Sequence, residues 1–316
     1  MNICLVGEGA FATKHLEAIS QINDVQVTAL VGGVETATKA LAEKYRIPFW
    51  TGDLEKGLRQ PGIEAAIIAS PTPIHAAQAQ QAMRLGKHVL IEIPMADTLD
   101  DAKAICATRK ETGVVAMAGH TRRFNPSHQW VHHKIQAGEL QIQHLDVQTF
   151  FFRRQNLNAL GEPRSWTDHL LWHHACHTVD LFAYQTGEEI VEVQAMQGPI
   201  HPELGIAMDM SIGLKSASGA LCSLTLSFNN DGPLGTFFRY VCDNGTYIAR
   251  YDDLVDGREN SVDVSQVDVS LNGIELEDRE FFNAIREQRE PNASVDQALA
   301  AMTVLDRLEK VLVQSR

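Results

Sequence analysis

Short apolar runs alternate with helical patterns along the first 120 residues. The run at residues 3–6 is too short for a helix, and it predicts a buried strand. Further strands are predicted at residues 25–31, 65–69, 88–93 and 114–118, with helical segments between them. Strands that alternate with helices in this way predict βαβ units and a parallel sheet.

Capping residues mark the helix ends in this region. The helix that follows residue 70 is predicted to reach Leu85, with Gly86 as its C-cap. Thr98 and Asp101 resemble a capping box at the start of the next helix, and Gly113 ends that helix. These residues indicate helix boundaries that do not depend on the apolar pattern.

After residue 120 the chain changes to apolar runs with few helices between them. We predict one helix at residues 166–180 and two closing helices at residues 275–287 and 295–313. The predicted strands are residues 150–152, 191–195, 208–214, 220–228, 238–242 and 262–269. Consecutive strands without intervening helices favour a mainly antiparallel sheet.

A glycine-rich turn follows the first predicted strand. Gly7, Gly9 and Ala12 form the pattern G-x-G-x-x-A between that strand and a helix. Gly7 allows the tight turn, Gly9 lets backbone N–H groups approach a pyrophosphate, and Ala12 lets helix and strand pack closely. The helix N-terminus then favours negative charge. The alternative is a glycine-rich turn without a ligand, but the flanking strand and helix favour dinucleotide binding.

These patterns together predict an α/β protein of two domains. Residues 1–120 are expected to form a Rossmann dinucleotide-binding domain. Residues 121–316 are expected to form an α+β domain for substrate binding and oligomerisation, with a mainly antiparallel open sheet. The last helix is free to pack back on the first domain. Because ligands bind at the carboxyl ends of parallel strands, we expect the active site between the two domains.

The segment at residues 166–180 is the richest in candidate catalytic groups. On a helix, His173 and His177 would share a face because they are four residues apart. Two such imidazoles can exchange protons at neutral pH or bind a metal. A zinc site needs three or four ligands, and no further ligand is evident from the spacing, so we expect no metal. The neighbouring His174 should point elsewhere and be structural. A satisfied core histidine is the alternative for each.

Composition excludes several classes of function. The net charge of −13 argues against nucleic acid as a partner, which would require a basic surface. No apolar run has the length needed to span a membrane, and the first residues lack the pattern of a signal peptide. The five cysteines are scattered, which is typical of reduced thiols and predicts a cytoplasmic protein.

The motifs along the whole chain resemble those of the glucose–fructose oxidoreductase, inositol dehydrogenase and rhizopine-catabolism (Gfo/Idh/MocA) family. The resemblance rests on Gly7-x-Gly9-x-x-Ala12, Ser70-Pro71-Thr72-Pro73-x-His75, Glu92-Ile93-Pro94 and His173-x-x-x-His177-x-x-Asp180. Family members usually have a lysine at the position of Ile93 and an aspartate at that of His173. The departures match one narrow branch, which also shares the motifs at residues 119–126 and 164–174.

The resemblance implies an oxidoreductase of that branch. Its substrate would be a dicarboxylic semialdehyde from the protocatechuate 4,5-cleavage pathway, which closes to a cyclic hemiacetal. NADP would accept the hydride from the hemiacetal carbon, and the product would be a pyrone dicarboxylate lactone. A hemiacetal hydroxyl is more acidic than an ordinary alcohol, so a histidine base, His177 or His173, can serve without the lysine. The implied cofactor-binding residues are Gly7, Gly9, Ala10, Phe11, Ala12, Gly32, Gly33, Ser70, Pro71, Thr72, His75, Glu92, Ile93 and Pro94.

The cofactor preference depends on the loop after the second predicted strand. An NAD-selective site needs an Asp or Glu there to accept the ribose hydroxyls. Residues 30–34 contain neither, and Glu35 comes late. This segment therefore contains nothing to repel a 2′-phosphate, and the resemblance implies NADP. No arginine follows Gly33, so NAD can also serve.

Paired arginines are the candidates for binding the substrate carboxylates, because a guanidinium grips a carboxylate with two parallel bonds. We expect Arg123 and Arg164 in this role, with Arg122 and Arg154 in reserve. His120 and Asp180 are further candidates near the substrate. A homodimer is expected from the resemblance. Two alternatives stay open: a family dehydrogenase that acts on a sugar or cyclitol, and a cofactor-bound regulator without turnover.

Overall fold

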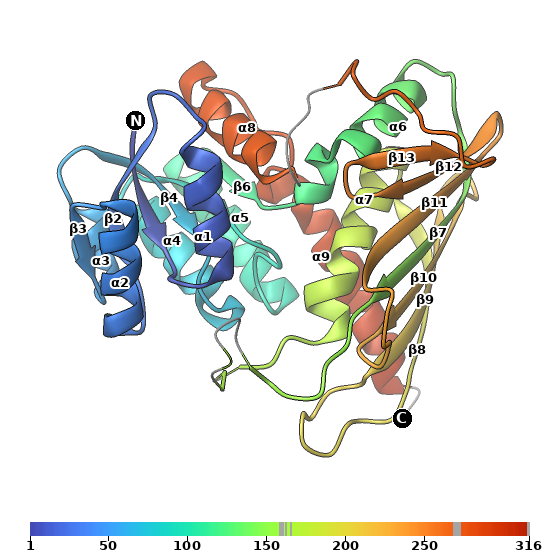
Figure 1. The fold of residues 1–316 in the computed structure, drawn as a ribbon, viewed down its shortest axis with the longest axis horizontal. Helices are drawn as coiled ribbons and strands as arrows, with labels where there is room; N and C mark the ends of the chain where they lie inside the picture. The colour runs from blue at the N-terminus through green and yellow to red at the C-terminus, as the bar shows by residue number, and fades with distance from the viewer. Residues whose placement is uncertain (158–160, 162, 165, 268–272, 315–316) are drawn as a thin grey trace. The chain divides into compact units, whose positions relative to one another are not determined.

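A computed structural model describes residues 1–157, 161, 163–164, 166–267 and 273–314. The chain divides into two compact units (Figure 1). The first unit contains residues 1–120 and 274–299, and the second contains residues 121–273 and 300–316. The predicted division assigned everything after residue 120 to the second domain, so residues 274–299 are a correction to it.

The first unit is a six-stranded parallel sheet with helices. Its strands run in the order β3-β2-β1-β4-β5-β6, and all of their pairings are parallel. The strands are β1 (Asn2–Val6), β2 (Gln26–Val31), β3 (Phe49–Thr51), β4 (Ile63–Ile68), β5 (His88–Ile91) and β6 (Ala116–Ala118). The helices are α1 (Ala10–Ile19), α2 (Glu35–Tyr45), α3 (Leu54–Leu58), α4 (His75–Arg84), α5 (Leu99–Thr112) and α8 (Ile274–Glu287). This is the predicted Rossmann sheet.

The core of the first unit explains why its strands are apolar throughout. Residues 3–5 of β1 and residues 65–68 of β4 are completely buried, because helices cover both faces of a parallel sheet. The predicted helix ends are confirmed at three positions. The Thr98 side chain accepts a hydrogen bond from the Asp101 backbone N–H, and Gly86 and Gly113 adopt left-handed conformations just past helix ends.

Buried contacts explain why residues 274–299 belong to the first unit. The Asp278 carboxylate on α8 binds the His15 ring on α1 at 2.9 Å. Farther along, the Ala118 N–H at the end of β6 donates to the Ala293 carbonyl, and the Cys106 thiol lies 3.3 Å from the Val295 carbonyl. The division between the units then falls inside α9 (Val295–Gln314), between Leu299 and Ala300.

The second unit is a seven-stranded sheet with helices on one face. Its strands follow the order β13-β12-β11-β7-β10-β9-β8, and only the β7–β10 pair is parallel. They are β7 (Ile142–Phe150), β8 (Ile190–Gln197), β9 (Asp209–Ser216), β10 (Leu221–Ser227), β11 (Gly235–Cys242), β12 (Gly245–Arg250) and β13 (Asp253–Asp256). Helix α6 (Pro126–Gln136), a 3₁₀ turn (Thr121–Phe124), helix α7 (Cys176–Thr186) and most of α9 complete it. The mainly antiparallel prediction is confirmed.

Three predicted elements in this unit differ from the structure. The predicted strand at residues 150–152 is only the end of β7, which begins at Ile142. Residues 262–267 lie in no strand, and residues 268–269 are outside the described residues. The predicted helix at 166–180 begins at Leu170, because Asp168 and His169 are extended, and it starts with a π-helical turn at Leu170–Ala175.

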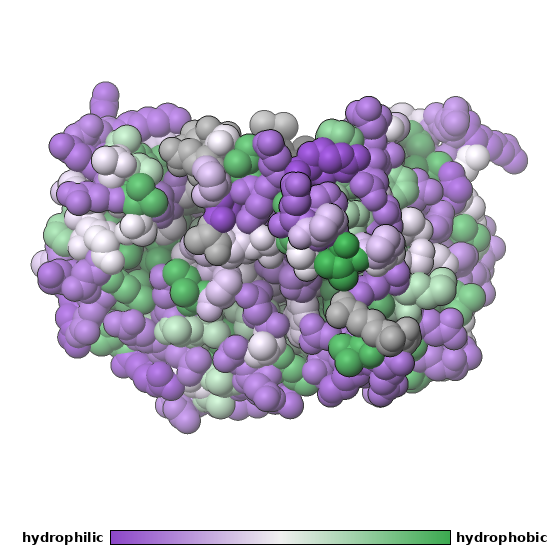
Figure 2. All heavy atoms as spheres, turned by 90° about the horizontal axis from the view of Figure 1, so that it is seen from below, coloured by the Kyte–Doolittle hydropathy of each residue, from purple (hydrophilic) through white to green (hydrophobic). Residues whose placement is uncertain are grey.

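The visible surface is mostly hydrophilic. Figure 2 shows hydrophobic side chains singly or in small groups among hydrophilic ones, as expected for a chain with a net charge of −13. Among the described residues, no helix is both long and apolar enough to cross a membrane.

Candidate functional site

The predicted dinucleotide turn has the geometry that its sequence pattern requires. Gly7 has a φ of +122°, and a Cβ there would lie 2.4 Å from the Ala69 carbonyl oxygen. A Cβ on Gly9 would meet no atom within 4 Å. Among the described residues, no side chain caps the N-terminus of α1 at Ala10–Ala12. Gly7 therefore serves the chain's own packing, whereas Gly9 and this helix end offer space and N–H groups that fit a pyrophosphate.

The loop after β2 contains an acidic group that the sequence pattern did not reveal. The Glu8 carboxylate, from the β1–α1 turn, accepts hydrogen bonds from the backbone N–H groups of Gly33 at 3.1 Å and Val34 at 2.8 Å. The inference that nothing there repels a 2′-phosphate considered only residues 30–34, and the structure corrects it. Gly32 is tightly packed, because a Cβ on it would lie 2.0 Å from the Thr38 hydroxyl.

Two further cofactor candidates lie at the carboxyl ends of β4 and β5. The His75 ring nitrogens lie 2.7 Å from the Ser70 carbonyl oxygen and 3.0 Å from the Pro94 carbonyl oxygen. Burial lowers the pKa of His75 and favours the neutral ring, which carries one N–H and so donates to only one of the two carbonyl oxygens. The ring contacts both loops. These contacts hold Pro71, the buried Thr72 and Ile93 in place, and His75 itself acts as a support for the loops.

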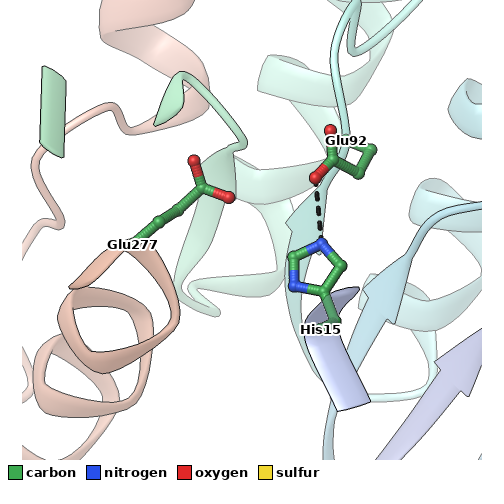
Figure 3. Close-up of side chains that lie close together, drawn as sticks. All are labelled: His15, Glu92 and Glu277. Atoms are coloured by element: carbon green, nitrogen blue, oxygen red, sulfur yellow. Dashed lines mark hydrogen bonds and ion pairs between the residues drawn. The ribbon is translucent and has the colours of Figure 1, made fainter. Parts of the chain in front are cut away.

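Glu92 belongs to a buried charged cluster in the first unit (Figure 3). The His15 ring binds Glu92 through Nε2 at 2.9 Å and Asp278 through Nδ1 at 2.9 Å. Burial alone would lower the pKa of His15, but the two carboxylates outweigh it and raise the pKa well above its usual range. The imidazolium therefore neutralises part of the negative charge of this cluster.

The same cluster is the one group of possible metal ligands among the described residues. His15, Glu92 and Glu277 place their ligand atoms within 4.8 Å of one another. A metal ligand must be a deprotonated nitrogen, but both nitrogens of His15 already bind carboxylates and carry protons there. The protons on His15 therefore explain why the carboxylates lie so close to the ring, and no metal ion is needed to explain it.

The histidine segment in the second unit does not form the regular helix that the prediction assumed. His173 and His174 lie in the π-helical turn, and His177 lies in the first turn of α7. The turn is wider than an α-helical turn, so the i,i+4 argument does not decide how His173 and His177 are oriented. π-Helical turns are frequent at functional sites.

The neighbours of His173 define its tautomer. Its Nδ1 accepts the backbone N–H of His169 at 3.3 Å, and its ring stacks on Trp166 with 5.4 Å between the ring centroids. An accepting Nδ1 has no proton, so the neutral ring carries its proton on Nε2. His173 is then a hydrogen-bond donor at Nε2.

An arginine pair and a histidine surround Asp168. Arg153 binds both oxygens of this carboxylate, Arg164 contacts it at 3.0 Å, and His174 contacts it at 3.2 Å. Despite burial, which acts in the opposite direction, His174 and Arg153 hold the pKa of Asp168 well below its usual value. His174 also packs against Phe228.

The other predicted substrate residues are placed in different surroundings. Arg123 is 5% exposed and binds Asp180 through two parallel bonds of 2.6 and 2.8 Å. Arg122 lies over the Tyr251 ring at 5.0 Å, and its buried Nε–H has no acceptor among the described residues. Arg154 donates to the Arg153 and Phe228 carbonyls and to the Asn229 side chain, and it lies over the Phe152 ring. The His120 backbone N–H donates to the Ala118 carbonyl.

Comparison with known proteins identifies the family. Residues 1–120 match the model of the oxidoreductase family with an NAD-binding Rossmann fold (GFO_IDH_MocA), and residues 126–268 match the C-terminal model of bacterial oxidoreductases. The 4-carboxy-2-hydroxymuconate-6-semialdehyde dehydrogenase of Sphingobium sp. (strain NBRC 103272 / SYK-6) is 61% identical over 309 residues, which are 98% of each chain. The chain belongs to the Gfo/Idh/MocA oxidoreductase family.

Solved structures agree with the fold of this oxidoreductase. Levoglucosan dehydrogenase in complex with NADH has a TM-score of 0.87 at 19% identity, over 99% of this chain and 97% of that one. UDP-N-acetylglucosamine 3-dehydrogenase from Acidithiobacillus ferrooxidans has a TM-score of 0.84 at 20% identity, with the same coverage. The match to the semialdehyde dehydrogenase and to the family model shows an NAD(P)-dependent dehydrogenase, and the solved structures show that the fold is the same.

Sequence reasoning missed four residues of these sites, which are Glu8, His15, Arg153 as the partner of Asp168, and Asp278. Glu8 is a variable position of the glycine motif, so the motif assigns it no role. His15 and Asp278 are distant in sequence, and no local pattern signals a contact across more than 260 residues. For Asp168, the alternation of charged residues with Arg164 and His174 was visible, but not its role as their common partner.

Proposed function

We propose that this oxidoreductase converts the cyclic hemiacetal of 4-carboxy-2-hydroxymuconate-6-semialdehyde to 2-pyrone-4,6-dicarboxylate. NADP is the proposed hydride acceptor, and NAD is a second one. The observation that carries the proposal is the 61% identity over 98% of the chain to a dehydrogenase of that semialdehyde. The histidine and arginine groups of the second unit supply the proton acceptor and the cations that this reaction requires.

The oxidation removes a hydride and a proton from the same C–OH group. A nicotinamide held by the first unit would supply the hydride acceptor. We assign the proton to His177, because Nε2 of His173 already carries a proton and its Nδ1 accepts the His169 N–H. His173 then donates a hydrogen bond to the substrate oxygen. Loss of the hydride from carbon and of the proton from oxygen converts the C–OH group into the carbonyl group of the lactone. The two electrons leave with the hydride.

We assign the substrate carboxylates to Arg164 and Arg122. Arg164 is a quarter exposed and contacts Asp168 through one nitrogen, which leaves other N–H groups for a ligand. The Arg122 Nε–H is a buried donor, and such donors normally have an acceptor, which a carboxylate would supply. Arg123 holds Asp180 in the structure, so we assign this pair a supporting role next to the substrate.

For the cofactor, we assign the pyrophosphate to Gly9 and the N-terminus of α1, and the nicotinamide end to the loops after β4 and β5. The open space at Gly9 and the uncapped helix end among the described residues support the first assignment. The absence of an acidic residue at positions 30–34 supports NADP, and Glu8 supports continued use of NAD.

The decisive experiment measures nicotinamide reduction at 340 nm with the enzymatically generated semialdehyde, followed by identification of the product by mass spectrometry. We expect turnover and a dicarboxylate lactone as product. A control panel of inositols and aldose sugars should give less than a hundredth of that specificity constant. Turnover of a polyol without turnover of the semialdehyde would replace this function with the sugar or cyclitol alternative.

We further propose a cytoplasmic homodimer. Two apolar side chains on strands of the second unit's sheet, Met196 and Leu221, are 74% and 46% exposed, and covering them in an interface would favour association. Cytoplasmic location is supported by five buried cysteines in a metabolic enzyme. Analytical ultracentrifugation at micromolar concentration tests the dimer: a single species of 34.9 kDa would contradict it.

A further inference from the structure

The Glu8 carboxylate binds the loop that follows β2, the loop that receives the ribose end of a dinucleotide in Rossmann domains. Gly33 N–H and Val34 N–H, at 3.1 and 2.8 Å from Glu8, are the backbone donors between β2 and α2. Two convergent N–H groups at the start of a helix form an anion-binding arrangement, and α2 has 11 residues. In this chain the anion that these N–H groups bind is the carboxylate of Glu8.

The position of this anion relates to the sugar end of a dinucleotide. In Rossmann domains the acid that accepts the ribose hydroxyls stands at the end of the second strand, and a phosphate on the ribose requires a cation there. Here β2 ends at Val31 without an acid, but the carboxylate of Glu8 reaches the following loop from the glycine turn. Gly32 also lies close to the Glu8 carboxylate, because a Cβ on Gly32 would lie 2.9 Å from Glu8 Oε2.

We propose that Glu8 is the specificity-determining residue for the ribose end of the cofactor. It accepts the ribose hydroxyls of NAD, and it reduces the preference for NADP over NAD in two ways. Its charge repels the 2′-phosphate, and it competes with the phosphate for the N–H groups of Gly33 and Val34. The inference rests on the proposed function only in taking a nicotinamide dinucleotide as the cofactor.

Glutamine at position 8 is the informative substitution. Glu8→Gln keeps an oxygen that accepts from Gly33 and Val34, so the loop keeps its hydrogen bonds while the negative charge is removed. Glu35→Gln is the matched control, because Glu35 lies in the first turn of α2 and its removal lowers the local charge equally. A general electrostatic effect would change both variants, whereas a direct role of Glu8 changes only the first.

The test uses ligands that need neither substrate nor turnover. The dissociation constants of ADP-ribose and of its 2′-phosphorylated form are measured by calorimetry for the wild type and both variants. We expect Glu8→Gln to shift the ratio of the two constants about tenfold toward the phosphorylated ligand, as expected for removal of one close charge. Glu35→Gln should leave the ratio within about twofold of the wild type.

Two outcomes would overturn the proposal. If Glu8→Gln leaves the ratio unchanged, the residue does not discriminate the ribose. If it weakens both ligands equally, Glu8 is only a structural cap for the loop. Because the readout is ligand binding, a failure to oxidise the semialdehyde would contradict the proposed function without affecting this result.

Discussion

A histidine that accepts a backbone N–H is restricted to one tautomer, and this restriction separates the two candidate bases. The His169 N–H fixes the proton of His173 on Nε2. Stacking on Trp166 at 5.4 Å also restricts the ring orientation. The tautomer of His173 therefore supports the proposed role of His177 as the proton acceptor.

Replacing His177 by Asn should reduce kcat by about 10²–10⁴-fold, the usual contribution of a general base, while the dissociation constant of NADP stays unchanged. His173→Asn should cost less, because a donor and not the base is lost. Steady-state kinetics and cofactor titration check both variants. Equal losses for the two variants, or turnover of His177→Asn above a tenth of the wild type, would remove His177 from the role of base.

The arginines should respond differently according to their partners. Arg164→Met and Arg122→Met should each raise the KM of the semialdehyde by about tenfold, since one charge-assisted hydrogen bond contributes roughly 1.5–3 kcal/mol. Weaker binding of the dicarboxylate product, measured by calorimetry, should accompany the change. Arg154→Met is the control, because its donors bind backbone carbonyls, and it should leave KM unchanged.

Arg123 should instead affect stability. Its removal leaves the Asp180 carboxylate, only 2% exposed, without its cation, and breaking a buried pair costs about 3–5 kcal/mol. We therefore expect Arg123→Met to unfold at distinctly lower urea concentration, and Arg123→Met combined with Asp180→Leu to recover part of the loss. A single variant as stable as the wild type would show that the pair does not support this site.

At the scale of secondary structure, the sequence predicted the elements whose pattern is local. The five predicted strands of the first unit and the caps at Thr98 and Gly113 depend on neighbouring residues, and they are confirmed. Strand β7 was mostly missed, because the polar residues Gln143, His144 and Asp146 interrupt its apolar pattern. The π-helical turn was not predictable, since it depends on how the preceding extended residues are held.

The candidate site was predictable to a smaller extent than the fold. Motifs along the chain indicated the glycine turn and the histidine segment. The partners that set charge and tautomer, such as Glu8 for Gly33 and Asp168 for Arg153, become apparent only after folding. The sequence shows which side chains are present, but only the folded structure shows which of them form hydrogen bonds or ion pairs with one another.

Gly7 and Gly9 form a matched pair for testing the glycine turn. Gly7→Ala should lower the melting temperature, because its Cβ would collide with the Ala69 carbonyl and the positive φ adds strain of about 1–3 kcal/mol. Gly9→Ala should fold like the wild type but bind NADP at least about tenfold more weakly, because the Cβ enters the space assigned to the pyrophosphate. Thermal unfolding and cofactor titration of both variants check this. Unchanged NADP affinity of Gly9→Ala would contradict the assignment.

Across the whole molecule, the buried cation of His15 makes stability depend on pH. Its pKa is raised above the unfolded value, so its contribution is complete below about pH 6.5 and is lost as the pH rises through the folded pKa. His15→Gln should therefore be destabilised by about 3–5 kcal/mol at neutral pH, since two buried carboxylates lose their cation. Urea unfolding of both proteins from pH 6 to 10 should show the gap narrowing at alkaline pH. A gap that is constant across that range would show that the ring is not charged in the folded state.

Residues 274–299 belong to the first unit but are synthesised after the sheet of the second unit, and this order affects folding during translation. Residues 1–120 leave the ribosome early, but α8 and its Asp278 emerge only after the whole sheet of the second unit has been made. Until then His15 lacks one of its two carboxylate partners, and the surface of α1 that α8 covers stays open. The nascent first unit is thus incomplete while its neighbour folds. Chains that stop before residue 274 should be captured by chaperones in place of folding as a free nucleotide-binding domain.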